Sequence, residues 1–291
     1  MEFKDSGLPQ NKLVEDAFNY SKKNALAGEK EMLKMVEQQV GMIFEQQKMM
    51  LDMAHQTGDL TDDQYEEEKK NFDKQRKMQM DALPAAVQKN LLEMFSAKRL
   101  GPARELQQHS DSASPDLLAA VMLVDCVRSP IDYENIEKKF GGGIAGLVAE
   151  VAHVEAYPSE RSDNLKKAAD DTRRAILARL ITDLEGVTKE IVKASKNPFN
   201  RVMIPPGQEE QMFSDAQATW GADKKLDARF VQSFNKFAEG AGSPFRVEVD
   251  AKGDLDLVKG APPQPPKLLP GPRGPKPPKP PGNGGIGGDV F

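Results

Sequence analysis

The sequence predicts a mainly α protein with a helical hairpin, a helical bundle, a small mixed segment and a disordered tail. Three observations predict this fold class. Apolar residues recur at helical spacing across residues 11–196, and helix-capping patterns mark several helix starts. Only one pair of alternating segments, near residue 250, is typical of strands. We therefore divide the chain into residues 11–83, 84–196, 197–259 and 260–291.

Residues 11–83 are expected to form a Met-rich, charged helical hairpin or coiled coil. A turn at residues 56–59 is followed by Thr61 and Gln64, a capping-box pattern that opens a second helix over about 62–82. Eight of the 13 Met lie between Met32 and Met80. They could form an adaptable surface for a protein partner, although we favour a hairpin or self-associating coiled-coil seam. The first helix of the hairpin has one apolar stripe, which consists of Leu33, Val36, Val40, Ile43, Met50 and Ala54.

Residues 84–196 are expected to form a compact helical bundle. Ser114-Pro115 and Ser129-Pro130 are typical of helix starts, and the second run ends at Gly141 to Gly143. Another apolar run covers residues 144–155, and one long helix is expected from about Asp163. We expect Leu147, Ile176, Leu180 and Leu184 to be buried together. Along the long helix, residues at helical spacing form one mainly apolar stripe, which consists of Leu165, Ala169, Thr172, Ile176, Leu180, Leu184, Val187 and Ile191.

The C-terminal parts differ in character. Residues 197–259 are expected to contain a helix around Phe230 and Phe234, then a β-hairpin of residues 245–249 and 255–258. The Pro- and Gly-rich, basic segment 260–291 carries four cations and one acid and should be disordered. Its Pro-x-x-Pro spacings could dock SH3-like grooves, or the segment could have no dedicated partner.

Composition restricts the function classes. A net charge of −5 argues against a nucleic-acid binder, and no apolar stretch reaches the roughly 18 residues of a membrane span. Residues 1–10 show no secretory signal, and the single Cys126 allows no intramolecular disulfide. We therefore expect a cytoplasmic protein.

Part of the bundle resembles a known enzyme family. Residues 121–127, 136–141 and 147–151, followed by the helical stretch 171–184, are similar in order and spacing to the HD-domain hydrolase half of RelA/SpoT-type alarmone enzymes. The resemblance covers about residues 95–195. It implies a helical fold in which an early His, a His-Asp pair and a late Asp bind Mn²⁺, while a Glu-Asp motif serves hydrolysis.

This chain departs from that pattern at most of the implied site positions. The early His falls near Leu100, and the His-Asp pair reads Val124-Asp125. The Glu-Asp motif falls on Arg128-Ser129, and the late Asp falls on Thr182, one residue before Asp183. A single carboxylate does not hold a divalent cation, so we expect a degenerate HD-like bundle without a metal, a cofactor or catalytic residues.

Other residues of potential chemical interest have simpler interpretations. His55, His109 and His153 have no partner at metal-ligand spacing, and Cys126 is expected to be a small buried apolar residue. Gly141 to Gly143 are expected to form a turn rather than an anion cradle. We interpret Asp170-Asp171 as a solvated helix face and Arg173-Arg174 as partners in surface salt bridges.

Two functions remain open from the sequence. The preferred one is a non-catalytic regulatory or protein-interaction module that uses the Met-rich hairpin or the Pro-rich tail, with homo-oligomer formation as an option. The alternative is a metal-dependent guanosine polyphosphate pyrophosphohydrolase with relocated ligands, such as Asp125, Asp183 and Glu185.

Overall fold

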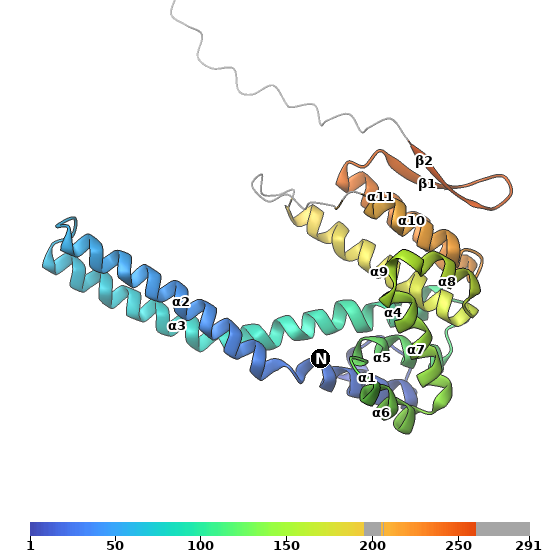
Figure 1. Cartoon of the computed structure of the whole chain (residues 1–291), viewed down its shortest axis with the longest axis horizontal. Helices are drawn as coiled ribbons and strands as arrows, with labels where there is room; N and C mark the ends of the chain where they lie inside the picture. Colours follow the sequence, from blue (N-terminus) through green and yellow to red (C-terminus); the bar gives the residue numbers. More distant parts are fainter. Residues whose placement is uncertain (195–204, 206, 260–291) are drawn as a thin grey trace, which may run out of the picture.

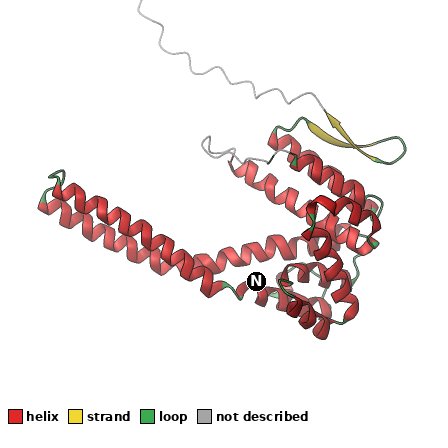
Figure 2. Ribbon diagram, in the orientation of Figure 1, coloured by secondary structure: helices red, strands yellow, loops and turns green. Residues whose placement is uncertain are grey.

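The protein consists of a long two-helix arm and a helical body (Figure 1). The computed structural model describes residues 1–194, 205 and 207–259. Helices dominate both parts, and a two-stranded sheet lies at one edge of the body (Figure 2). The mainly α fold class is therefore confirmed. The predicted tail, 260–291, lies outside the described residues.

The arm is formed by α2 (Glu29–Gln56) and α3 (Asp62–Met94). The predicted capping box is present, because the Thr61 side chain accepts from the Gln64 N–H and the Gln64 side chain reaches the Thr61 N–H. Phe44 and Phe72 meet edge to face at 5.5 Å between ring centroids. A carboxylate of Asp52 accepts a 2.7 Å hydrogen bond from the Tyr65 hydroxyl. These contacts fix the register of the two helices.

The hairpin differs from the predicted range at both ends. Residues before the arm form a separate helix, α1 (Lys12–Leu26), which packs against the body through Phe18. At the other end, α3 continues through Pro84 to Met94 instead of ending near residue 82. Pro removes one helical hydrogen bond but does not end the helix here. Buried Val87 and Leu91 lie on this continued part.

Short helices build the first half of the body. After the N-terminal turn η1 (Phe3–Asp5), α1 and the arm, the chain continues through η2 (Phe95–Leu100), α4 (Gly101–His109), α5 (Pro115–Leu123) and η3 (Val124–Cys126). The next helices are α6 (Pro130–Phe140) and α7 (Gly142–Ala156). Ser114 and Ser129 cap α5 and α6 as predicted, and all nine residues of α5 except Pro115 and Asp116 are buried.

The long helix predicted from Asp163 is interrupted. The turn η4 (Pro158–Glu160) leads into α8 (Arg161–Lys167), which ends at the extended backbone of Ala168, and α9 (Asp170–Ala194) begins afterwards. Glu150 explains the break, since its carboxylate accepts from the Ala169 N–H at 3.1 Å and from the Thr172 hydroxyl at 2.7 Å. A side chain from α7 thus caps α9.

The core lies around α5 and α9. Ile176, Leu180 and Leu184 are buried as predicted, whereas Leu147 is only partly buried at the edge of the same cluster. In the C-terminal part, α10 (Gln208–Thr219), which the sequence did not indicate, precedes the predicted α11 (Lys224–Ala241).

The predicted β-hairpin is present. Strands β1 (Phe245–Val249) and β2 (Leu255–Lys259) pair antiparallel, with Val247 opposite Leu257. Asn235 of α11 bonds both backbone groups of Val247, so the hairpin leans on a helix. Among the described helices, none combines the length and the apolar character that a membrane crossing requires.

Candidate functional site

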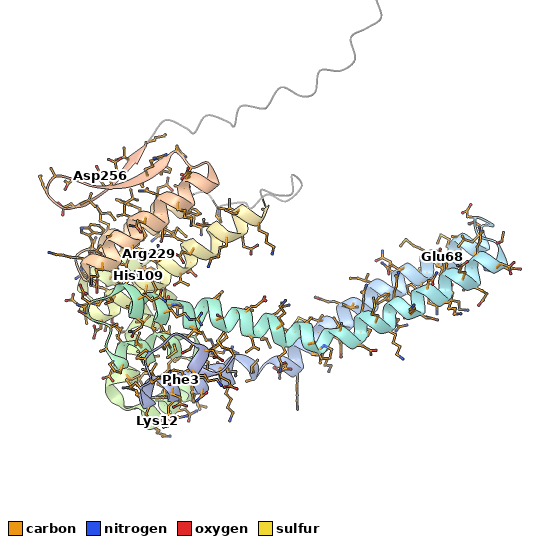
Figure 3. The ribbon with its side chains drawn as sticks, turned by 180° about the vertical axis from the view of Figure 1, so that it is seen from behind. Phe3, Lys12, Glu68, His109, Arg229 and Asp256 are labelled. Atoms are coloured by element: carbon orange, nitrogen blue, oxygen red, sulfur yellow. The ribbon has the colours of Figure 1, made fainter. Side chains whose placement is uncertain are left out.

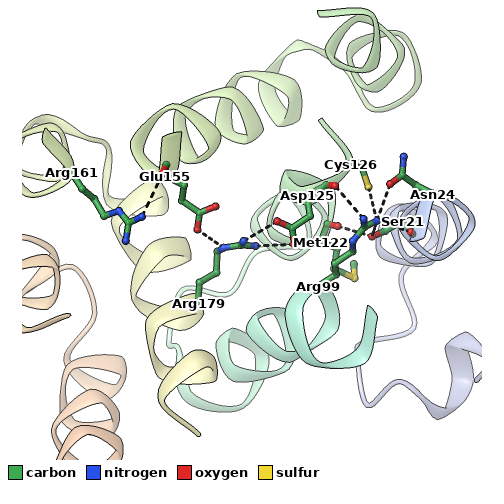
Figure 4. A network of polar contacts seen from close by, with 9 residues as sticks. All are labelled: Ser21, Asn24, Arg99, Met122, Asp125, Cys126, Glu155, Arg161 and Arg179. Atoms are coloured by element: carbon green, nitrogen blue, oxygen red, sulfur yellow. Dashed lines mark hydrogen bonds and ion pairs between the residues drawn. The ribbon is translucent and has the colours of Figure 1, made fainter. Parts of the chain in front are cut away.

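An arginine bound by two carboxylates lies where α9 meets η3 and the end of α7. Arg179 donates to Asp125 at 2.9 and 3.4 Å and to Glu155 at 2.6 Å (Figure 4). We call these three residues the Arg179 cluster. Its members come from three elements, so the cluster ties α9 to the rest of the body.

Burial and charge act together in the Arg179 cluster. The side chains are 15–28% exposed. Burial alone would lower the pKa of Arg179, but Glu155 and Asp125 outweigh it and raise this pKa. Burial raises the pKa of Glu155, and Arg179 opposes that shift. The guanidinium is therefore charged at every physiological pH and neutralises carboxylates that would otherwise be destabilised by burial.

A second arginine lies on the other side of Asp125. Arg99, which is 7% exposed, donates to the Ser21 carbonyl at 2.9 Å, to Asn24 at 3.1 Å and to the Cys126 sulfur at 3.3 Å. It also donates to the Asp125 carbonyl at 3.1 Å. Arg99 thereby joins α1 to η3, and the acceptors that surround it are uncharged (Figure 4).

The site positions that the resemblance implies lie beside Arg99, Asp125 and Arg179 along the chain. Leu100 and Val124 are buried next to the arginines, and Thr182 lies one turn of α9 after Arg179. A Cβ placed on Gly101 would lie 2.6 Å from the Thr182 methyl group, so this part of α9 packs tightly against the start of α4.

These positions do not fit a divalent metal ion. Leu100 and Val124 supply no lone pair, and the Thr182 hydroxyl donates to the Ala178 carbonyl at 2.8 Å. Asp125, the carboxylate that remains, is bound by Arg179. Across the described ranges 1–194 and 207–259, no group of three or more His, Cys, Asp or Glu side chains could hold a metal ion.

Within the relocated ligand set, Glu185 has partners of its own, whereas Asp125 and Asp183 both lie near Arg179. Glu185 pairs with Arg229, which also binds Glu105 at 3.0 Å. The Asp183 side chain makes no hydrogen bond or ion pair with another described residue, but burial raises the pKa of its carboxyl group, and Arg179 and Lys98 oppose that shift. Asp183 therefore lies within electrostatic range of Arg179 and Asp125, but the two carboxylates belong to no group of three possible metal ligands among the described residues.

The histidines and the cysteine also lie apart. His55 stacks on Tyr65 at 4.2 Å in the arm, His109 lies 3.9 Å from Glu105, and His153 contacts Tyr157. Cys126 is buried as expected, and burial raises the pKa of its thiol. Gly141, with φ of 88°, forms the turn before α7.

Arg173 and Arg174 have a larger role than the predicted surface salt bridges. They pair with Asp170 and Asp171 at 3.1 and 2.8 Å, as expected. In addition, Arg173 donates to the Trp220 carbonyl and Arg174 to the Ala222 carbonyl. They therefore hold the loop between α10 and α11 against α9.

Sequence reasoning missed Arg99, Arg179 and Glu155. Each is a charged residue beside apolar positions of a helix, which is a signal that the charged group is buried with a polar partner. Their partners are 24 to 78 residues away along the chain, so the pattern gave no means of pairing them.

Cavities lie next to the cluster and elsewhere. One of about 380 Å³ lies at the base of the arm and is lined by Gly28, Met32, Lys98, Arg128 and Asp125, among others. Another of about 490 Å³ lies between α9 and α11 and includes Glu185 and Arg229. Asp125 belongs both to the Arg179 cluster and to the lining of the first cavity, so this cavity extends from the cluster toward the arm.

Comparison with known families finds a match over the helical part of the body that the resemblance concerns. Residues 85–194 match the family model of the HD domain, somewhat more than a third of the chain. A search of curated proteins and a search of solved structures each found no match.

Proposed function

We propose that the HD domain of this protein is non-catalytic and that the protein works as a regulatory or protein-interaction module in the cytoplasm. In this proposal, the Arg179 cluster replaces a metal centre of the RelA/SpoT type. The body then serves as a rigid base for the arm, which presents an adaptable surface to protein partners.

One observation carries the proposal. Asp125, the carboxylate retained from the His-Asp pair, is neutralised by the guanidinium of Arg179 at 2.9 Å. A metal ion entering here would have to displace a cation that two carboxylates hold, and it would lie against that positive charge. Neighbouring positions 100 and 124 offer no replacement ligands.

Phosphate hydrolysis in a metal-dependent HD hydrolase requires a tightly bound metal ion that polarises the phosphate and activates a water molecule. Without such a donor set, the remaining side chains stabilise structure: Arg179 joins α9 to η3 and α7, and Arg99 joins η3 to α1. The Met-rich arm and the Pro-rich tail are then the parts proposed to contact proteins.

Two assays on the full-length chain test the proposal. Calorimetric titration with Mn²⁺ and a guanosine tetraphosphate hydrolysis assay in Mn²⁺ are run on the wild type and on Asp125→Ala. We expect no saturable heat of binding and no turnover above the buffer rate in either protein. Micromolar Mn²⁺ affinity, or turnover that disappears in Asp125→Ala, would instead support a hydrolase with relocated ligands.

A further inference from the structure

An apolar stripe runs along α2, mostly on the side opposite the Phe44 contact with α3, and its Met32 end reaches the junction with α3. Phe44 is buried against α3, whereas Met42 and Ile43 beside it are 66% and 54% exposed. The exposed members include pairs spaced by seven residues, the period with which one helix packs along another. The α2 stripe consists of Met32, Met35, Val36, Gln39, Met42, Ile43, Gln46, Met49, Met50 and Met53.

The α2 stripe is symmetric about its midpoint, so a second, antiparallel copy of the helix places residues of the same kind opposite each other. If the midpoint is set between Met42 and Ile43, Met32 falls opposite Met53 and Met35 opposite Met50. By the same rule, Val36 falls opposite Met49 and Gln39 opposite Gln46. Apolar positions thus meet apolar positions, and each amide meets an amide.

This midpoint coincides with the middle of the helix. Since α2 spans Glu29–Gln56, two antiparallel copies centred between Met42 and Ile43 overlap along their full length. A two-fold axis requires a surface patch to be complementary to itself in this way. An arm that extends away from the body leaves room for a second arm beside it (Figure 1).

We propose that this protein forms a homodimer in which the α2 stripes of two copies pack antiparallel. The occupant of the exposed face is therefore a second copy of the same chain. This inference rests on α2 alone and stands whether or not the HD domain is catalytic.

Charge at the two ends of the arm supports the antiparallel direction. The tip, residues 56–68, contains six Asp and Glu and no Lys or Arg, and Glu68 lies near this end (Figure 3). At the base, the cavity lined by Met32 carries three cations, Lys98, Arg99 and Arg128, and one acid, Asp125. Lys98 lies within electrostatic range of Asp183 and Arg128 within range of Asp132, so the cations of this cavity outnumber but do not exclude nearby acids.

An antiparallel dimer places each acidic tip beside the cationic base of the other copy. Met32 belongs both to the α2 stripe and to the lining of the basal cavity, so the two surfaces are continuous. A parallel dimer would instead bring two tips of six acids together, and like charges across an interface are unfavourable. Charge complementarity therefore selects one of the two directions.

Solution mass measurements with matched variants test the dimer. Light scattering coupled to gel filtration, and analytical ultracentrifugation, are run on the full-length wild type, Met42→Lys and Met78→Lys. Met42 and Met78 are equally exposed, at 66% and 65%, but Met78 is on α3. We expect a wild-type dimer, an unchanged Met78→Lys dimer and a dissociation constant raised at least about 30-fold for Met42→Lys. Far-UV circular dichroism checks that each variant keeps its helix content.

Cysteine cross-linking tests the direction. Cys126 is buried, which leaves introduced thiols as the reactive ones. Under oxidation, a Met35→Cys, Met50→Cys double variant should form disulfide-linked dimers, while Met35→Cys alone should not. In an antiparallel pair, residue 35 lies about 22 Å from its own copy, as 15 residues at 1.5 Å each. Salt tests the charge contribution. We expect weaker dimerisation as NaCl rises from roughly 0.05 M to roughly 0.5 M, because the added salt screens the attraction between the acidic tip and the cationic base.

Three results would overturn the proposal. These are a wild-type monomer at the highest soluble concentration, a dimer that tolerates Met42→Lys, and efficient cross-linking of Met35→Cys alone. The last would show a parallel pair.

Discussion

Arg179 holds two carboxylates that come from different elements, and its removal should destabilise the body. In Arg179→Met, Asp125 and Glu155 lose their cation while they stay largely buried. We expect the free energy of unfolding to fall by about 3 kcal/mol, the lower end of the range for partly exposed pairs, because removing one partner leaves uncompensated buried charge. Urea unfolding measures this loss.

The matched control is Arg76→Met, which removes an exposed ion pair with Glu45 at 3.5 Å in the arm. Exposed pairs contribute about 0–1 kcal/mol, so this variant should be close to wild type. Equal losses in the two variants would show that the Arg179 cluster has no special structural role.

Asp227 should make stability depend on pH. It is 4% exposed, one of its carboxylate oxygens has no partner, and burial raises its pKa to about 6. Because this folded pKa lies above the ordinary value of 3.8, the folded protein binds more protons between the two values. The contribution is complete below about pH 4 and is lost as pH rises through about 6.

Asp227→Asn removes this titration and keeps an oxygen for the Gly221 N–H. We expect the variant to be more stable than wild type by about 2–3 kcal/mol at pH 8, with the difference vanishing toward pH 3. Chemical unfolding at several pH values checks the sign. A pH-independent difference, or one that grows at low pH, would contradict the assignment.

At the scale of elements, the contact between α4 and α9 depends on the lack of a side chain at Gly101. A Cβ there would meet the Thr182 methyl group at 2.6 Å. Gly101→Ala should therefore cost about 1–3 kcal/mol through overpacking. Thr182→Ser removes that methyl group and should recover most of the loss in the double variant. Unfolding free energies of the four proteins form the cycle, and strict additivity would show that the two residues do not meet.

Pro84 lies inside α3, where the arm joins the body. Pro84→Ala restores a backbone donor in the helix and should stabilise α3, by up to about 3 kcal/mol. Hydrogen exchange of amides in residues 80–94 measures the effect locally. Faster exchange in the variant would indicate that the proline is required by the packing at this junction.

Element starts were the most predictable feature of the fold. Thr61, Ser114 and Ser129 cap helices where the sequence indicated, since a cap is a local interaction. Ends that depend on distant residues were missed: Glu150 on α7 caps α9 and divides the predicted long helix. That Leu100 and Val124 stand in the place of metal ligands stays a prediction from the family resemblance. The guanidinium that neutralises Asp125 was not evident from the sequence, because ion pairing across 54 residues leaves no local pattern.

At the scale of the whole molecule, the arm and the body differ in how they are stabilised. The body has a continuous core around α5 and α9, whereas α2 contributes only Phe44 as a buried side chain. Amides of the arm should thus exchange faster than those of α9. In the proposed dimer, exchange in α2 should slow as protein concentration rises, while exchange in α9 stays constant. Exchange in α2 that is independent of concentration over the range in which dimers form would contradict that interface.

The central claim is that the Arg179 cluster replaces a metal centre, and thermal unfolding with and without Mn²⁺ tests it most directly. A metal that binds the folded protein with micromolar affinity would add about 4 kcal/mol of stability at millimolar Mn²⁺. We predict that 1 mM Mn²⁺, on the order of a thousand times such an affinity, leaves the unfolding temperature of the wild type and of Asp125→Ala unchanged. A rise of several degrees in the wild type that is absent in Asp125→Ala would contradict the claim.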